Sequence, residues 1–218
     1  MKSLFGSRQS YSRPELVSDG VVHVLGVVAA LSSVPVLVTL TAFLRGDPSA
    51  IAGTVIYGAT LIGMLLCSGL YNMNTSERWQ GLLRRLDHSA IYFKIAGTYT
   101  AFVLLSGTGL ALAAILWLAA TLGAVLKVAA PYRFRWLGLT LYFAMGWAGL
   151  VAGWPIFATM SAPVFALVVI GGLIYSIGTL FYLMERMPYH NTLWHIFVLA
   201  ASGVFYAAVT THVVLTAV

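Results

Sequence analysis

Long apolar stretches separated by short polar segments dominate this chain. A helix that crosses a bilayer needs about 20 consecutive apolar residues, whereas barrel strands show alternating segments of about ten. The runs therefore predict an all-α protein: a seven-transmembrane helix bundle that forms one domain over residues 1–218. The predicted spans are approximately 20–43, 50–71, 88–105, 110–126, 136–154, 163–184 and 192–217.

A short polar segment divides the third predicted span from the fourth. It reads Ser106-Gly107-Thr108-Gly109, and glycines in such a segment are typical of a tight turn. We therefore expect spans three and four to form a helical hairpin.

Basic residues predict how the bundle crosses the membrane. The first, third and fifth connections lie on one side of the membrane, and Arg45 is the only basic residue on that side. Lys94 lies within a span. The remaining basic residues all fall on the other side: Lys2, Arg8, Arg13, Arg78, Arg84, Arg85, Lys127, Arg133, Arg135 and Arg186. Cytoplasmic loops are rich in Lys and Arg, so we expect a cytosolic N-terminus and an external C-terminus.

Composition supports a membrane protein and excludes several other classes. Hydrophobic residues make up 60% of the chain and charged residues 8%, with a mean hydropathy of +0.91. A soluble domain of this length could not cover its surface with so few polar groups. The net charge of +6 comes from loop residues rather than from one basic face, so we expect no nucleic-acid binding. Cys67 is the only cysteine, which excludes an intramolecular disulfide.

Polar side chains gather at the predicted cytosolic ends of the spans. Asn72 ends the second span, Asp87 opens the third, and Asn191 and His195 open the seventh. Lys94 lies two turns further into the third span, on the same helical face as Asp87, and a lysine in a helix leans toward the helix N-terminus. An ionisable residue inside a bilayer costs about 2.5–3.5 kcal/mol, so these side chains form a candidate polar pocket.

Each of these residues also has a purely structural interpretation. Asn is favoured at helix C-termini, whereas Asn and Asp are favoured as N-caps. His195 and His23 could be hydrogen-bonded packing residues, and Lys94 could extend toward the lipid headgroups.

Three segments carry a family resemblance. They read SGLYN at 68–72, RRLDHSAIY at 84–92 with IAGTYT at 95–100, and PYHNTLWH at 188–195. Together with Glu15 and HVLG at 23–26, they resemble the hemolysin III family, the bacterial branch of the progestin and adipoQ receptor superfamily. The resemblance covers nearly the whole chain and implies a seven-helix protein of the bacterial inner (cell) membrane.

The family resemblance also implies a zinc site, from which this chain departs. The family pattern is S-x3-H ending span two, an Asp opening span three and H-x3-H opening span seven. Here Ser68, Asp87 and His195 match, but Asn72 and Asn191 occupy two of the three His positions. Carboxamides are poor zinc ligands, so the sequence predicts a degenerate site, favours no cofactor and leaves zinc as the alternative.

Two roles for the site residues follow from the resemblance. If a metal binds, His195 is its ligand, and Asp87 and Ser68 take catalytic roles. Without a metal, we expect the Lys94 ammonium to supply positive charge where relatives hold zinc, with Asn72 and Asn191 completing a hydrogen-bonded network.

The sequence is compatible with three functions. The favoured one is membrane lipid homeostasis or sensing without catalysis, with membrane lipids as partners and a lipid or small molecule in the inner pocket. The alternative is a metal-dependent hydrolase of ceramide-like amides. Pore formation or cytolysis is the third, and it is disfavoured because no span carries polar residues along its whole length. Oligomeric state stays open.

Overall fold

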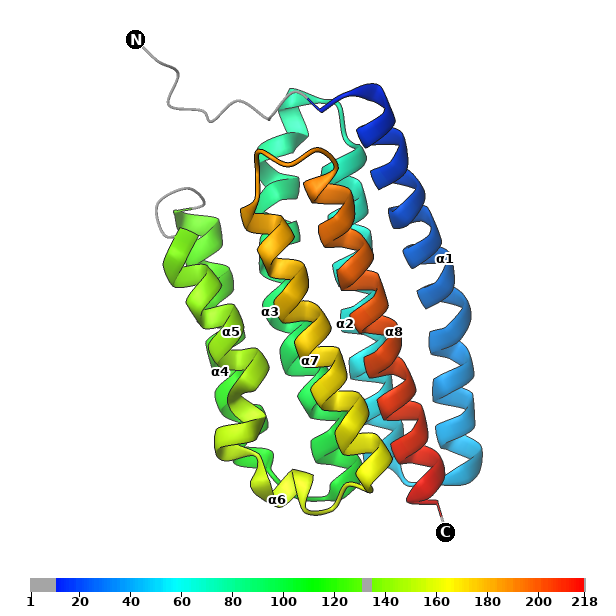
Figure 1. The fold of residues 1–218 in the computed structure, drawn as a ribbon. Coiled ribbons are helices and arrows are strands. Elements are labelled where there is room, and N and C mark those ends of the chain that lie inside the picture. The colour runs from blue at the N-terminus through cyan, green and yellow to red at the C-terminus, as the bar shows by residue number, and fades with distance from the viewer. Residues whose placement is uncertain (1–10, 131–134, 218) are drawn as a thin grey trace.

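The computed structural model describes residues 11–130 and 135–217 of the chain, and within these ranges it contains helices and no strand. The long helices run side by side as a bundle (Figure 1). They are α1 (Arg13–Leu44), α2 (Pro48–Met73), α3 (Glu77–Ser106), α4 (Leu110–Ala129), α5 (Arg135–Ala152), α6 (Trp154–Phe157), α7 (Ala162–Leu183) and α8 (His190–Leu215).

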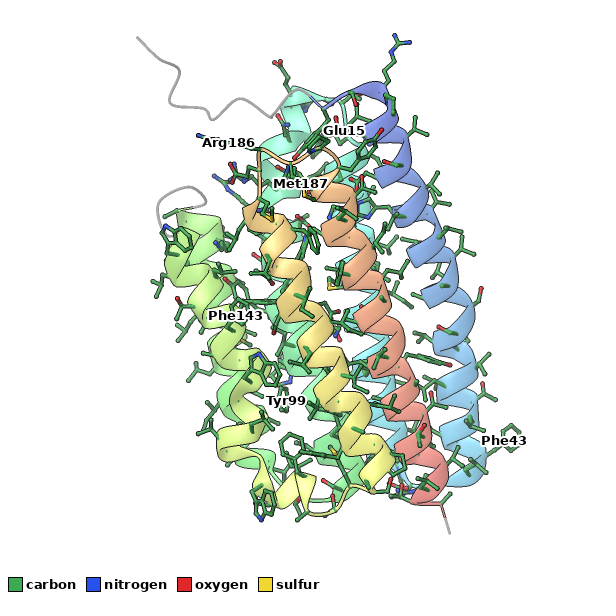
Figure 2. The ribbon with its side chains drawn as sticks, viewed as in Figure 1. Glu15, Phe43, Tyr99, Phe143, Arg186 and Met187 are labelled. Atoms are coloured by element: carbon green, nitrogen blue, oxygen red, sulfur yellow. The ribbon has the colours of Figure 1, made fainter. Side chains whose placement is uncertain are left out.

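Six described helices are long and apolar enough to cross a membrane: α1, α2, α3, α4, α7 and α8. The fifth predicted span matches a shorter apolar helix over Trp136–Ala152. Large apolar side chains cover the outside of the bundle, as expected where lipid replaces water. Phe43 is 87% exposed and points away from the helices (Figure 2).

Three predicted spans differ from the observed helices. The first was expected to begin at residue 20, but α1 begins at Arg13, where the Ser12–Glu15 capping box starts the helix ahead of the apolar run. The third span was expected to begin at residue 88, but α3 begins at Glu77. Residues 77–87 are too charged for an apolar run, yet helix-forming Leu and Arg residues keep them helical. The fifth span was expected to reach residue 154, but Gly153 and Pro155 interrupt it and the separate short helix α6 follows α5.

The predicted turn between the third and fourth spans is confirmed. Gly107 and Gly109 have φ angles of +69° and +84°, a left-handed conformation in which glycine has no Cβ penalty. Helices α3 and α4 pack against each other on either side of this turn, as a hairpin.

Packing is uneven around the bundle. Helices α2 and α3 pack most extensively, and a Cβ added to Gly97 of α3 would overlap the Thr60 hydroxyl of α2. Helix α5 instead contacts mainly α4 and α3 and touches α7 only sparsely. This sparse packing places α5 at the wall of a large internal cavity.

The starts of α1, α3 and α8 and the end of α2 lie at one end of the bundle, here called the amino-terminal end (Figure 1). Specific contacts join α1 to α8 there. Glu15 forms a capping box with Ser12 and also accepts a hydrogen bond from the Tyr189 backbone N–H at 2.9 Å. The hydroxyls of Ser18 and Thr192 lie 3.1 Å apart. These contacts set the rotation of α1 against α8.

Three of the basic residues used to predict orientation, Lys2, Arg8 and Arg133, lie outside the described residues.

Candidate polar site at the amino-terminal end

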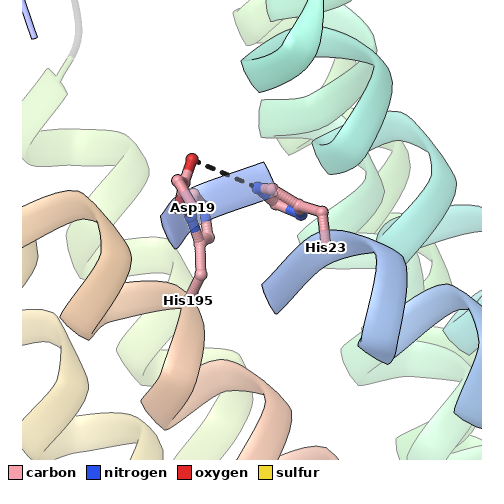
Figure 3. Close-up of side chains that lie close together, drawn as sticks. All are labelled: Asp19, His23 and His195. Atoms are coloured by element: carbon pink, nitrogen blue, oxygen red, sulfur yellow. Dashed lines mark hydrogen bonds and ion pairs between the residues drawn. The ribbon is translucent and has the colours of Figure 1, made fainter. Parts of the chain in front are cut away.

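Two helices supply the centre of a buried polar cluster. Asp19 and His23 are four residues apart on α1, and Asn191 and His195 are four residues apart on α8, so each pair shares one helical face. Asp19, His23 and His195 are 6%, 4% and 7% exposed. Figure 3 shows Asp19 and His23 with His195 from the neighbouring helix beside them.

Asp19 is the hub of this cluster. His195 Nδ1 lies 2.6 Å from Asp19 Oδ1, and Asn191 Nδ2 donates to Asp19 Oδ2 at 3.1 Å. His23 Nε2 lies 3.5 Å from the same Oδ2 atom. Because a carboxylate can only accept, the His195 contact places a proton on Nδ1.

The two asparagines extend the network to α2. Asn191 Nδ2 also lies within hydrogen-bond distance of Asn72 Oδ1, at 3.3 Å. Asn72 Nδ2 in turn donates to the Ser68 carbonyl at 3.0 Å. The carboxamides at the two expected histidine positions are therefore engaged with each other and with Asp19.

The capping interpretations of these residues are wrong. Asp87 cannot cap α3, because that helix begins at Glu77. Asn72 does lie in the last turn of α2, but the C-cap is Asn74, and Asn72 lacks the left-handed backbone for which Asn is favoured at a helix end. Asn191 lies within the first turn of α8, whose N-cap is Tyr189 with a φ of +57°.

Asp87 lies near the cluster but has its own partners. Its Oδ2 atom is 3.2 Å from His88 Nδ1, and the Ser68 hydroxyl is beside the carboxylate. Asp87, Ser68 and His195 all line the large cavity. The structure thus brings the two residues with expected catalytic roles to the same cavity wall as His195.

Lys94 does not contact the asparagine network. Its Nζ atom lies 4.6 Å from the ring centres of both Tyr175 and Phe205, on α7 and α8. Asp87 lies seven residues away, or about 10 Å along the helix axis, whereas the aromatic faces are close enough for cation–π attraction. The Lys94 side chain therefore packs against the rings of α7 and α8.

These groups line two cavities of very different size. The large one has a volume of about 190 Å³ and is lined by His23, Ser68, Asp87, Lys94 and His195 among many apolar side chains. The small one, about 10 Å³, is lined by Asp19, Asn72 and Asn191 with neighbouring residues of α1 and α8. That volume suits about one water molecule.

Sequence reasoning missed Asp19, and it favoured a structural hydrogen-bonding role for His23 over a place in the site. Asp19, His23 and His195 each offer one potential ligand atom, and the three atoms lie within 4.8 Å of one another. Two imidazoles and a carboxylate are a donor set that zinc and other divalent transition metals accept, so these residues fit a cation where Asn72 and Asn191 do not. The sequence feature that could have revealed Asp19 is the Asp-x3-His spacing at the polar start of the first span.

These features define a membrane-embedded helical bundle with a buried His/Asp/Asn site at one end. The family model described as "Haemolysin-III related" matches residues 13–206, and the chain belongs to this family. The Hemolysin-3 homolog of Bacillus subtilis (strain 168) is 38% identical over 200 residues, covering 89% of this chain and 92% of the relative.

More distant relatives are consistent with this membership. Hemolysin-3 of Bacillus cereus is 32% identical over 206 residues, covering 93% of this chain and 94% of the relative. The Monocyte to macrophage differentiation factor of Homo sapiens is 26% identical over 166 residues, covering 71% and 67%. The family resemblance of the three sequence segments is confirmed.

Proposed function

We propose that the chain crosses the bacterial inner membrane seven times as one domain, with its N-terminus in the cytosol. Six long apolar helices and the shorter α5 supply the spans. The 18 residues of α5 extend about 27 Å, close to the thickness of the hydrocarbon core. The concentration of basic residues at the amino-terminal end supports the orientation.

The function that we propose for this protein is recognition of membrane lipids in lipid homeostasis or sensing, without catalysis. One observation carries it: Asn72 and Asn191 hydrogen-bond each other and Asp19. Carboxamides used in this way satisfy each other and Asp19 through hydrogen bonds rather than through an ion, which supports a degenerate form of the family's zinc site in this chain. The adjacent cavity, lined mostly by apolar side chains, is the space for a lipid.

Metal quantification on the purified protein tests this proposal. Mass spectrometry of the wild type should find far less than one zinc per chain. A double variant, Asn72→His with Asn191→His, rebuilds the three-histidine pattern and should gain about one zinc per chain, which shows that the assay detects an occupied site. Stoichiometric zinc in the wild type that disappears in His195→Ala would contradict the proposal.

The second candidate is a metal-dependent hydrolase of ceramide-like amides, and the Asp19, His23 and His195 donor set favours it. A bound zinc would polarise a carbonyl and acidify water. Asp87 and Ser68 would orient the reacting groups from the cavity wall. Release of fatty acid from a ceramide analogue that stops with a chelator and in His23→Ala would establish this function. Unchanged lipid after prolonged incubation would exclude it for that substrate.

A further inference from the structure

Lys94 is a buried basic residue to which none of the described residues offers an anionic partner. It lies in the middle of α3 and is 3% exposed. Among the residues that the structure describes, its ammonium contacts the Tyr175 and Phe205 rings and has no hydrogen-bond acceptor or carboxylate within bonding distance. Ring faces stabilise a cation only in part, so an ammonium buried at this depth favours an anion beside it.

The space beside Lys94 has the shape and lining for an alkyl chain. Lys94 lines the 190 Å³ cavity together with apolar residues such as Ile95, Phe102, Val168 and Leu199. A water-sized group needs about 10–15 Å³, so the cavity holds on the order of a dozen such groups. The lining reaches from His195 at the amino-terminal end to Phe157 near the other end of the bundle.

The charges around the cavity favour one kind of head group. Among the described residues that line the cavity, two are Lys or Arg: Lys94 near mid-depth and Lys127 near the end of α4. Asp87 is the one carboxylate among the described lining residues; it is about 10 Å from Lys94 along α3 and already contacts His88. An incoming acidic group would therefore meet an available ammonium at mid-cavity without a competing carboxylate at that position.

We propose that this cavity binds a single-chain amphiphile with an acidic head group, such as a long-chain carboxylate or alkyl phosphate, and that Lys94 holds the head. The alkyl chain lies along the apolar walls. This inference rests on the proposed lipid-recognising function and adds the chemical class of the lipid and the residue that selects it.

Equilibrium binding of radiolabelled dodecanoate to purified protein in a nonionic detergent tests the inference. In the wild type, dodecanoate and dodecyl phosphate should compete at least about tenfold better than dodecanol, because an ion pair of this kind is worth a factor of ten or more. Their relative strength shows which acidic head the site prefers. Acetate should compete far more weakly, since it lacks the chain.

Variants assign the head-group preference to Lys94. Lys94→Met keeps the length of the side chain without its charge, and it should lose the preference for dodecanoate over dodecanol. Lys94→Arg should retain the preference. Lys127→Met is the matched control, because it removes the other lysine of the same cavity, and it should behave as the wild type does.

Different results would refute Lys94 as the anchor and lipid recognition as the function. Equal wild-type affinity for acid and alcohol, or a preference that survives in Lys94→Met, refutes Lys94 as the anchor but leaves lipid recognition intact. Absence of binding by every amphiphile refutes lipid recognition as well. If Lys94→Met does not fold, the wild-type comparison of acid with alcohol and the Lys94→Arg variant decide the question.

Discussion

Replacing Asp19 tests whether the cluster at the amino-terminal end stabilises the bundle. In Asp19→Ala, His195 Nδ1 and Asn191 Nδ2 lose the acceptor that they contact at 2.6 and 3.1 Å. Each buried donor left without a partner costs about 1–3 kcal/mol, while removing the carboxylate also removes its own desolvation cost. We expect the free energy of unfolding to fall by about 2–4 kcal/mol.

Asp19→Asn should have a smaller effect. Asparagine keeps one acceptor for His195 but presents an amide N–H₂ group to Asn191. The Asn191 amide then has to rotate so that its oxygen, rather than its nitrogen, faces residue 19. That rotation disturbs the contact with Asn72, so one hydrogen bond is lost rather than two. The expected loss of unfolding free energy is about 1–2 kcal/mol.

The assay is unfolding of the purified protein in mixed dodecyl maltoside and SDS micelles, followed by circular dichroism. Glu77→Ala is the control, because Glu77 is an exposed acidic residue in the first turn of α3 and should change the free energy by less than about 0.5 kcal/mol. An Asp19→Ala protein as stable as the Glu77→Ala control would refute the reasoning and reduce Asp19 to a dispensable side chain.

Three further predictions concern other parts of the molecule. Gly97→Ala should lower the unfolding free energy by about 1–3 kcal/mol in the same titration, because the added Cβ overlaps the Thr60 hydroxyl. Asp47 caps α2, and hydrogen bonds from the Ser49 hydroxyl and the Ala50 backbone N–H hold its pKa below the usual range. The stability that distinguishes the wild type from Asp47→Ala, about 0.5–1 kcal/mol, should therefore persist at neutral pH and disappear as pH falls below about 4. Liposomes with sparse protein should retain an entrapped ion, since no span carries a continuous polar row; rapid leakage would restore pore formation as a candidate.

The helices were largely predictable because apolar length is a strong signal. The turn at Gly107 and Gly109 was also predictable, since glycine is needed where φ is positive. The start of α3 was not, because residues 77–87 form an amphipathic extension whose charges hide it from an apolar criterion. Length and hydropathy mark the part of a helix inside lipid, not the helix itself.

The candidate site was predicted less completely. The positions of Asn72, Asn191 and His195 led correctly to one end of the bundle, because residues at the same end of neighbouring helices meet in space. Asp19 escaped notice because its role depends on how α1 is rotated against α8, which the Glu15 contact with Tyr189 helps to set. No periodicity within one helix encodes the rotation of two helices against each other.

His195 links the two cavities of this protein. Its Nδ1 atom contacts Asp19, which lines the small polar cavity, while its ring lines the large cavity that Lys94 also lines. Because Asp19 holds the orientation and proton of the imidazole, a ligand that contacts His195 in the large cavity acts on the same hydrogen-bonded chain that reaches Asn191. His195 therefore has a structural role that does not depend on a metal: it joins the hydrogen-bonded network between α1, α2 and α8 to the large cavity in which we propose that a lipid binds.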